Sequence, residues 1–499
     1  MHHAMLGRGP ARGPLASPSA PPLATLARRG RLAAAALLAA AACAAAAAST
    51  ALPPEIRRAL QKARVDPRHL SVVVQEAGSG APVLYHEGRE PVNPASLTKL
   101  VTTYAALDLL GPAWTWKTGV WLDGAVQGGV LDGSLVIRGS GDPTLAVERV
   151  WLLLQRVRQL GVREIRGDIV LDRSAFAEPE RSPADFDGEP LRPYNVKPDA
   201  LLLNFKAVTY RFTPDAARGV AVVGVEPRLD GVAVDAEVPL GRGPCNDWRG
   251  ALKATLDDPT RVRFEGTYPA NCGERAWPVA YVDPASYNAR LLRALWLDSG
   301  GRLAGTVRDG AAPAGVPPTF ELESPPLAAV VRDINKHSNN VMAQQLFLTL
   351  GASPAGSPPA TPEAARQALA RWVAARFGEP EPGFRLDNGS GLSRETRMTA
   401  QWLARLLQVA WGSAVMPELM ASLPVAGLDG TLRRSRATSG RAHLKTGSLR
   451  DVAAVAGYVL GNSGRRYVLV AIVQHPNANA ARPALDALVQ WTLDDTARR

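Results

Sequence analysis

The segment from Asn93 to Leu100, Asn-Pro-Ala-Ser-Leu-Thr-Lys-Leu, places a serine and a lysine three residues apart at the start of a predicted helix. Residues at i and i+3 share one face of a helix, so the side chains of Ser96 and Lys99 can meet. A neutral lysine amine can then remove the hydroxyl proton and make the serine a nucleophile. The alternative is that Ser96 only caps the helix and that Lys99 is solvated.

Lysine is scarce in this chain, and its scarcity singles out Lys99. Of 57 basic residues only eight are lysines, at positions 62, 99, 117, 197, 206, 253, 336 and 445, and only Lys99 follows a serine by three residues. Arginine stays charged in proteins, whereas a buried lysine can lose its proton and act as a base. The preceding Asn93-Pro94-Ala95 would place Ser96 at a helix N-terminus, where free backbone N–H groups favour a developing oxyanion.

Two later motifs extend this pair. Ser338-Asn339-Asn340 opens an apolar helical segment, and Lys445-Thr446-Gly447-Ser448 precedes an apolar strand. S-x-x-K, S-D-N and K-T-G together describe penicillin-binding proteins and serine β-lactamases, and here they follow in the order that this fold requires.

Both later motifs also occur a second time. Lys117-Thr118-Gly119 is another K-T-G, and Ser286-Tyr287-Asn288 is another S-x-N. The copies at 338 and 445 lie beside an apolar helix and a closing pair of strands, whereas the others lie in a region of short strands. We therefore select the copies at 338 and 445 and interpret the others as ordinary strand and helix-start residues.

The pattern along the chain separates two kinds of structure. Residues 71–76 and 82–86 predict a hairpin, and a helix follows from about Ser96 to Gly111-Pro112. From Trp114 to about Ser324, short β-like runs alternate with turns, with helices expected at 145–160 and 286–297. The rest predicts helices at 327–350, 361–377 and 398–410, a strand pair at 452–460 and 466–474, and a last helix at 482–494. The two ends would thus form one unit and the middle an insertion.

The chain resembles the D-Ala-D-Ala carboxypeptidase/endopeptidase family of low-molecular-mass penicillin-binding proteins, in the type with large inserted domains. Beside the segment around Ser96, the resemblance rests on G-S-G-D-P-T at 139–144, H-S-N-N at 337–340, D-N-G-S-G-L-S at 387–393, L-P-V-A-G-L-D-G-T-L at 423–432 and H-L-K-T-G-S-L at 443–449. It implies an α/β (α+β) transpeptidase domain, like that of penicillin-binding proteins and serine β-lactamases, split by mainly-β inserted domains. We expect the catalytic domain at 52–113 and 325–499, and an inserted region at 114–324 with an inner domain at roughly 213–276.

The resemblance also implies roles for the motif residues. Ser96 would attack the carbonyl between two terminal D-alanines, and Lys99 would act as the general base. Ser338 would relay a proton to the leaving amine, and Asn340 would hold the substrate amide and Lys99. The segment Lys445-Thr446-Gly447-Ser448 would bind the carboxylate of the substrate or of a β-lactam. Lys445 would offer it a positive charge, and Thr446 and Ser448 would form hydrogen bonds with it. The N–H groups of Ser96 and Ser448 would form the oxyanion hole. The loop at 387–393 either lines the cleft or is a plain turn.

The resulting functional prediction is a serine D-Ala-D-Ala carboxypeptidase, a D,D-endopeptidase, or both. It would act on peptidoglycan stem peptides through an acyl-enzyme on Ser96, and β-lactams would inhibit it. A serine β-lactamase is one alternative, although no E-x-x-L-N segment follows the second motif. A non-catalytic wall-binding protein is the other, although all three motifs are intact.

Residues 1–48 predict an export signal. A basic segment ends at Arg31, an Ala/Leu run extends from Leu32 to Ala48, and Ala46 and Ala48 offer an A-x-A cleavage site. The alternative is a membrane anchor, although the run is Ala-rich and barely long enough to span a bilayer. We expect a periplasmic or otherwise extracytoplasmic protein with no stable membrane insertion after signal removal.

The charge and the Cys and His content indicate which partners, disulfides and metal sites to expect. The formal net charge is +11, but residues 1–48 hold five arginines and no acidic residue, which leaves a mild excess spread along the chain and argues against a nucleic-acid partner. Without that segment only Cys245 and Cys272 remain, which favours one disulfide over two free thiols. His86-Glu87 lacks the second His of H-E-x-x-H, so we expect neither a metal nor a cofactor.

Overall fold

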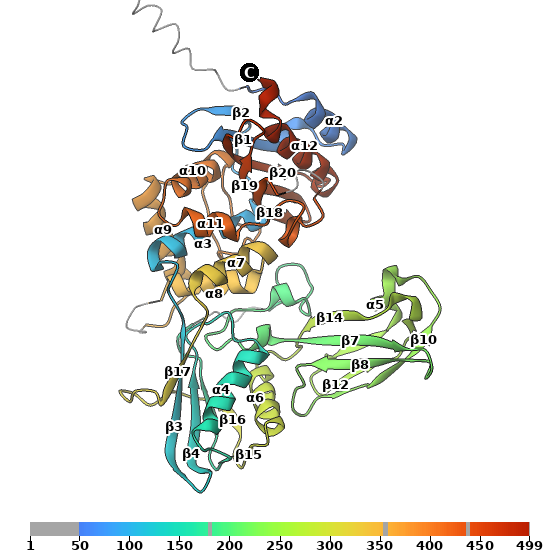
Figure 1. The fold of residues 1–499 in the computed structure, drawn as a ribbon, viewed down its shortest axis with the longest axis vertical. Coiled ribbons are helices and arrows are strands. Elements are labelled where there is room, and N and C mark those ends of the chain that lie inside the picture. Colours follow the sequence, from blue (N-terminus) through green and yellow to red (C-terminus); the bar gives the residue numbers. More distant parts are fainter. Residues whose placement is uncertain (1–48, 178–181, 353–357, 436–439, 499) are drawn as a thin grey trace, which may run out of the picture. The chain divides into compact units, whose positions relative to one another are not determined.

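A five-stranded antiparallel sheet joins the two ends of the chain. The computed structural model describes residues 49–177, 182–352, 358–435 and 440–498, so the signal predicted at 1–48 lies outside the described residues. The sheet runs in the order β18 (Ala442–Leu449), β19 (Val452–Leu460), β20 (Arg466–Gln474), β1 (Leu70–Glu76) and β2 (Pro82–His86). Both predicted hairpins are confirmed, since β1 pairs with β2 and β19 with β20. Figure 1 shows blue N-terminal and red C-terminal strands side by side.

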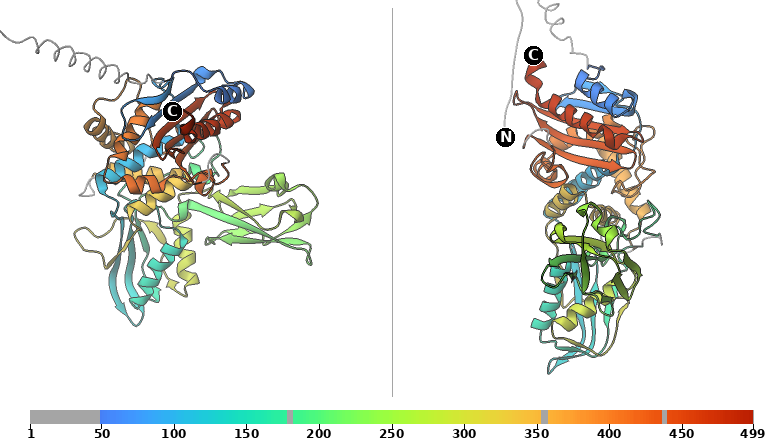
Figure 2. Two further views of the ribbon diagram at one scale, coloured as in Figure 1. Left: turned by 45° about the horizontal axis from the view of Figure 1, so that its top comes forward. Right: turned by 90° about the vertical axis from the view of Figure 1, so that its right-hand side faces the viewer.

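Helices cover both faces of this sheet. Side chains alternate between faces along a strand, and here both alternate sets are buried: Val73 packs into one core, and Val72 and Val74 pack into the other. The second core also contains α2 (Pro54–Lys62) and α12 (Arg482–Leu493), which lie side by side (Figures 1 and 2). Burial on two faces explains why these strands read as continuous apolar runs in the sequence.

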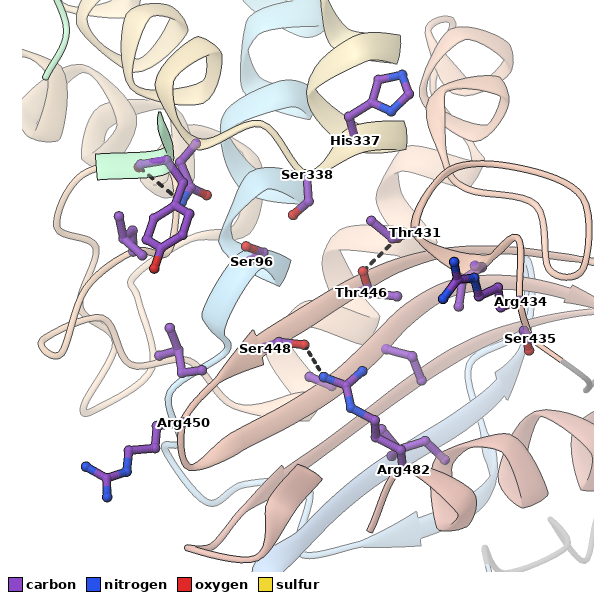
Figure 3. A pocket seen from close by; sticks show the side chains of 18 of the residues that line it. Ser96, His337, Ser338, Thr431, Arg434, Ser435, Thr446, Ser448, Arg450 and Arg482 are labelled. Carbon is purple, nitrogen blue, oxygen red and sulfur yellow. Dashed lines mark hydrogen bonds between the residues drawn. The ribbon is translucent and has the colours of Figure 1, made fainter. Parts of the chain in front are cut away.

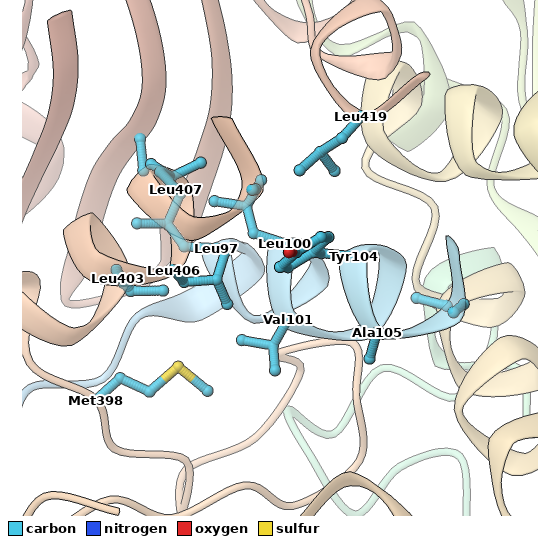
Figure 4. Packing of buried hydrophobic residues seen from close by; sticks show 14 of the residues in the cluster. Leu97, Leu100, Val101, Tyr104, Ala105, Met398, Leu403, Leu406, Leu407 and Leu419 are labelled. Carbon is cyan, nitrogen blue, oxygen red and sulfur yellow. The ribbon is translucent and has the colours of Figure 1, made fainter. Parts of the chain in front are cut away.

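The buried helix α3 (Thr98–Leu110) lies in the first core. Every residue from Thr98 to Leu107 is buried, so the helix has no solvent-facing stripe. Figure 4 shows Leu97 and Leu100 near Leu406 and Leu407 of α10 (Ala400–Trp411). The helix ends at Gly111, as predicted, because this glycine adopts a φ of 82° that other residues rarely take.

The predicted helix at 327–350 is wrong in one respect, because the structure divides it into α7 (Leu327–His337) and α8 (Asn340–Leu350). Ser338 ends α7 in the left-handed conformation, with a φ of 55°. Asn339 then caps α8 by accepting a hydrogen bond from Met342 N at 3.1 Å. Residues 335–340 are all polar, and the start of α8 agrees with the apolar helical segment expected to open at Ser338-Asn339-Asn340, so only the expectation of one continuous helix is wrong.

The remaining helices of this part are α9 (Pro362–Phe377) and α11 (Met416–Ser422). The predictions at 361–377, 398–410 and 482–494 correspond to α9, α10 and α12. Helices α2 and α11 were not predicted from the sequence. In α2 the signal was present, because Pro54 occupies the first turn and the buried Ile56 and Leu60 are four residues apart.

The segment between α3 and α7 forms mainly strands. One sheet contains β3 (Lys117–Gln127), β4 (Val130–Arg138), β5 (Glu164–Ile165), β6 (Ile169–Asp172), β15 (Arg302–Leu303), β16 (Val307–Asp309) and β17 (Phe320–Glu323). The predicted helices at 145–160 and 286–297 are α4 (Val147–Gln159) and α6 (Tyr287–Asp298). The start and the end of this segment lie side by side, because Ser324 N donates to Trp116 O and Leu327 N donates to Trp114 O.

Two smaller sheets lie within this segment. One contains β7 (Ala207–Asp215), β8 (Val220–Glu226), β10 (Glu237–Gly241), β13 (Tyr268–Pro269) and β14 (Arg275–Ala280). The other contains β9 (Ala233–Val234), β11 (Ala254–Asp258) and β12 (Arg261–Phe264), and the short helix α5 (Trp248–Ala251) lies between β10 and β11 in sequence. A disulfide links Cys245 to Cys272 here, with 5.2 Å between the Cα atoms. The domain boundaries themselves remain predictions.

Candidate active site

Ser96 lies on a tight turn that leads into α3. The helix expected from Ser96 begins as a one-turn 3-10 helix, Ala95–Leu97, and becomes α-helical at Thr98. Asn93 fixes the turn: its Oδ1 accepts a hydrogen bond from Ala95 N, and its Nδ2 donates to Ser393 O, both at 2.9 Å. Ala95 has a φ of 47°, so the turn holds a backbone conformation that is unfavourable for a residue with a side chain.

The Lys99 amine is surrounded by three oxygens. Its Nζ lies 3.0 Å from Ser96 Oγ, 2.7 Å from Asn340 Oδ1 and 2.6 Å from Ser390 O. The side chain is fully buried. Burial, and next the charge of Lys445, hold the pKa of the Lys99 amine well below its ordinary value of 10.5.

This arrangement fits a neutral amine that acts as a base. A neutral amine has two N–H groups and one lone pair. Asn340 Oδ1 and Ser390 O are pure acceptors and take the two N–H groups, which leaves the lone pair for the Ser96 O–H. The Ser96 distance is within the range needed for proton transfer.

The loop at 387–393 does more than form a turn. Ser390 supplies the carbonyl that accepts from Lys99, and Gly389 O accepts a hydrogen bond from Thr102 Oγ1 at 2.6 Å. Gly391 has a φ of 79°, and a Cβ on it would lie 1.9 Å from Ala95 O. The loop thus packs directly on the turn that holds Ser96. The role of Ser390 was not predicted from the sequence, because every residue has a backbone carbonyl; only the motif D-N-G-S-G-L-S indicated the loop.

Ser338 and Lys445 meet across the cleft. Lys445 Nζ donates hydrogen bonds to Ser338 Oγ and to Thr446 O, both at 2.8 Å. The Lys445 side chain is fully buried, and burial lowers its pKa to about 7. The left-handed backbone of Ser338, at the end of α7, positions its hydroxyl for this contact.

Strand β18 presents its residues to two sides. Thr446 and Ser448 face the pocket, whereas Lys445 and Gly447 are buried. A Cβ on Gly447 would lie 2.8 Å from Pro94 O, so glycine at this position lets the strand approach the nucleophile turn closely. Thr446 Oγ1 shares a hydrogen bond of 2.8 Å with Thr431 Oγ1.

A pocket of about 950 Å³ opens at this site. Its lining includes Ser96, Ser338, Asn340, Thr446 and Ser448. Figure 3 shows Ser96 at the start of α3, Ser338 at the end of α7, and Thr446 and Ser448 on β18, directed at a common space. Segments that are far apart in sequence are thus brought together, as the three motifs predict.

The second copies of the motifs lie elsewhere. Lys117 starts β3 and is exposed, where it pairs with Glu321 at 3.1 Å. Asn288 is buried in α6 and donates to Leu201 O at 2.7 Å. Neither lines the pocket that contains Ser96.

The sequence matches the D-Ala-D-Ala carboxypeptidase 3 (S13) family over residues 52–494. This chain belongs to that family. It is therefore a serine peptidase, a hydrolase of the D-alanyl-D-alanine carboxypeptidase type, with the fold of penicillin-binding proteins that was predicted. The match also spans the segment between α3 and α7, so the strands of this segment are part of the family pattern.

Curated relatives and solved structures agree. The chain is 29% identical over 439 residues to a D-alanyl-D-alanine carboxypeptidase of Actinomadura sp. (strain R39), covering 83% of this chain and 79% of that one. It is 25% identical over 401 residues to the D-alanyl-D-alanine carboxypeptidase DacB of Haemophilus influenzae, covering 76% and 80%. The crystal structure of penicillin binding protein 4 (dacB) from H. influenzae has the same fold, with a TM-score of 0.70, 22% identity, and 87% and 99% coverage.

The described residues contain neither a membrane-spanning helix nor a cluster of metal-binding side chains. No helix in the described ranges has the length and apolar character needed to cross a membrane. Likewise, the residues that the structure covers contain no group of three or more His, Cys, Asp or Glu side chains able to hold a metal ion.

Proposed function

We propose that this S13 peptidase cleaves the bond between two terminal D-alanines of a peptidoglycan stem peptide through an acyl-enzyme on Ser96. The observation that supports this most directly is the Lys99 amine, buried at 3.0 Å from Ser96 Oγ with two acceptors for its N–H groups. β-Lactams would inhibit the enzyme by acylating the same hydroxyl.

In the first step, Ser96 Oγ attacks the carbonyl carbon while its proton moves to Lys99 Nζ. The oxyanion would be stabilised by the backbone N–H groups of Ser96 and Ser448, from the start of α3 and from β18. Asn340 has two tasks in this proposal. Its Oδ1 orients Lys99, and its amide group, which borders the pocket, would hold the substrate amide.

In the second step, the bond to the leaving nitrogen breaks and the amine needs a proton. Ser338 would relay this proton by giving its own hydroxyl proton to the amine and taking up the proton that Lys99 received from Ser96. The hydrogen bond from Lys445 Nζ favours this relay, because the ammonium stabilises negative charge that develops on Ser338 Oγ. Water then attacks the acyl-enzyme and releases the shortened stem peptide, with Ser96 regenerated. Thr446, Ser448 and the field of Lys445 would receive the substrate carboxylate.

The same acyl-enzyme serves carboxypeptidase and endopeptidase reactions, since only the leaving amine differs: free D-alanine, or a D-amino centre on a neighbouring stem peptide. Such substrates lie outside the cytoplasm, so the proposal includes export by residues 1–48 to the periplasm or an equivalent compartment. The Ala/Leu run from Leu32 to Ala48, with its A-x-A site, supports export.

The test uses purified cross-linked muropeptides, with products identified by mass spectrometry. We expect loss of one alanine, cleavage of the cross-link, or both, and none with Ser96→Ala. Penicillin should add its mass to the peptide that contains Ser96. Sustained rapid hydrolysis of nitrocefin would instead support a β-lactamase, and the absence of any adduct on folded protein would support a non-catalytic wall-binding protein.

A further inference from the structure

The cleft contains a cation that the proposed mechanism does not use. Arg482 is the first residue of α12, and its exposed side chain lines the pocket beside β18. One N–H donor, on Nη2, reaches Ser448 Oγ at 2.7 Å, and Nη2 also lies 3.1 Å from Asn479 Oδ1. Figure 3 shows the guanidinium directed at Ser448.

Lys445 is poorly placed to contact a carboxylate directly. Its side chain is fully buried, and its amine already donates to Ser338 Oγ and Thr446 O. Burial lowers its pKa to about 7, so this amine, unlike a guanidinium, can lose its proton near neutral pH. A carboxylate that relied on Lys445 alone would lack a permanent counter-charge.

The position of the substrate carboxylate follows from the chemistry of the substrate. In a terminal D-alanine, only the amide nitrogen and one carbon separate the carboxylate from the scissile carbonyl. The carboxylate must therefore lie close to Ser96. Gly447 brings β18 against the nucleophile turn, and Thr446 and Ser448 then project into the cleft beside it.

We propose that Arg482 is a specificity-determining residue that binds the C-terminal carboxylate of the substrate, together with the hydroxyls of Thr446 and Ser448. This inference rests on the proposed function. Arginine remains charged and offers several N–H groups in a planar fork, so Arg482 can hold Ser448 and still donate to a carboxylate.

The groups around Arg482 leave its guanidinium available to bind a carboxylate. Both hydrogen-bond partners, Ser448 and Asn479, are neutral. Asp486 lies four residues further along α12 and lines the same pocket. Burial raises the pKa of Asp486, and Arg482 is close enough for its charge to lower that pKa, but within the described ranges no carboxylate forms an ion pair with Arg482 at 4.0 Å or less. Arg450 also borders the pocket, yet Figure 3 shows its guanidinium directed away from Ser96.

The experiment compares two substrates that differ only at their C-terminus: diacetyl-L-Lys-D-Ala-D-Ala and the same peptide ending in a carboxamide. For Arg482→Gln we expect kcat/KM on the carboxylate substrate to fall by about 10- to 100-fold, the range of a charge-assisted hydrogen bond. On the carboxamide it should change by less than about threefold, because the lost contact is absent there. Arg482→Lys should retain part of the preference. The control is Arg465→Gln, which removes an exposed arginine from the turn between β19 and β20.

Equal losses on both substrates would overturn the proposal, because Arg482 would then act only by holding Ser448. Unchanged activity on both would overturn it as well. Failure of the proposed function looks different: the unmodified protein would cleave neither peptide and would form no penicillin adduct on Ser96. Melting temperatures of all variants separate a folding defect from a binding defect.

Discussion

Lys336 Nζ lies 2.6 Å from Asp429 Oδ2, and this ion pair joins the helix that ends at Ser338 to the loop that follows α11. The other oxygen of Asp429 accepts a hydrogen bond from Val425 N at 2.7 Å. Two residues beyond Asp429, Thr431 bonds to Thr446 on β18. The loop L-P-V-A-G-L-D-G-T-L thus connects the two sides of the cleft, which gives a structural reason for a motif that has no chemical group in the mechanism.

We predict that Asp429→Asn slows acylation by penicillin by about 5- to 150-fold while Ser96 and Lys99 stay in place. The variant leaves the Lys336 ammonium buried without its anion, and loss of one partner of a partly buried pair costs roughly 1–3 kcal/mol. Stopped-flow acylation measures the effect. Glu395→Gln, which breaks the exposed pair with Arg385, is the control and should change little.

The pair also gives a pH dependence. Burial raises the pKa of Asp429, but hydrogen bonds from Lys336 and Val425 outweigh it and leave the pKa below the ordinary value of 3.8. The stabilisation from Asp429 is therefore present above pH 3.8 and is lost as the pH falls through the lowered pKa. If Asp429→Asn acylates at the rate of the unmodified protein, the loop that contains Asp429 does not hold the two sides of the cleft in position.

The lysines provide a second prediction. Lys99→Arg should abolish acylation while the protein remains folded, because a guanidinium does not deprotonate and cannot act as the base. The matched control is Lys117→Arg in the other K-T-G segment, an exposed residue of β3 that should tolerate the change. Labelling with a fluorescent penicillin reports both. Acylation by Lys99→Arg at a near-normal rate would refute its assignment as the base.

A third prediction concerns Lys445. Its pKa of about 7 means that the ammonium loses its proton as the pH rises through neutrality, and Ser338 then loses its charged donor. The pH profile of kcat/KM should therefore decline on the alkaline side near 7. Lys445→Arg should keep part of the activity and lose this decline, because arginine stays charged. A decline that persists in the arginine variant would have to come from another group.

The reactive side chains of the site could be predicted from the sequence because their residue types and spacing are unusual. Lysine is rare here, and Ser96, Lys99, Ser338 and Lys445 each belong to a short motif that the fold then brings together. The strands of the main sheet were also readable, since burial on both faces produces unbroken apolar runs.

What the sequence did not reveal depends on backbone atoms and on contacts between distant segments. Ser390 acts through its carbonyl, which every residue has. Arg482 reaches the cleft only because α12 begins beside Ser448, and nothing distinguishes it from the other arginines in sequence. The left-handed backbone of Ser338 is also not visible in the residue types, although the polar run at 335–340 lies where the helix breaks.

The disulfide supports a fourth prediction. Cys245 and Cys272 should resist alkylation in the native exported protein and become reactive after reduction. The double variant Cys245→Ser, Cys272→Ser should still be acylated by penicillin, because neither cysteine lines the pocket with Ser96. It should lower stability by up to about 3–4 kcal/mol, the chain-entropy value for a loop of this length. Mass spectrometry that finds two free thiols in native protein would contradict the pairing.

A glycine pair tests how closely the 387–393 loop supports the nucleophile. Gly391 and Gly464 both have positive φ, at 79° and 86°, so alanine strains the backbone at each. At Gly464 nothing lies within 4 Å of an added Cβ, whereas at Gly391 the Cβ would lie 1.9 Å from Ala95 O. Both variants should lose a similar amount of stability from backbone strain, about 1 kcal/mol. Only Gly391→Ala must also move the turn that holds Ser96, or move Ser390 away from Lys99. We therefore expect its acylation rate to fall by at least about 100-fold, the scale of a 1 Å misplacement at a reacting centre, while Gly464→Ala acylates normally. Equal acylation rates in the two variants would show that the loop yields and that the position of Ser96 does not depend on it.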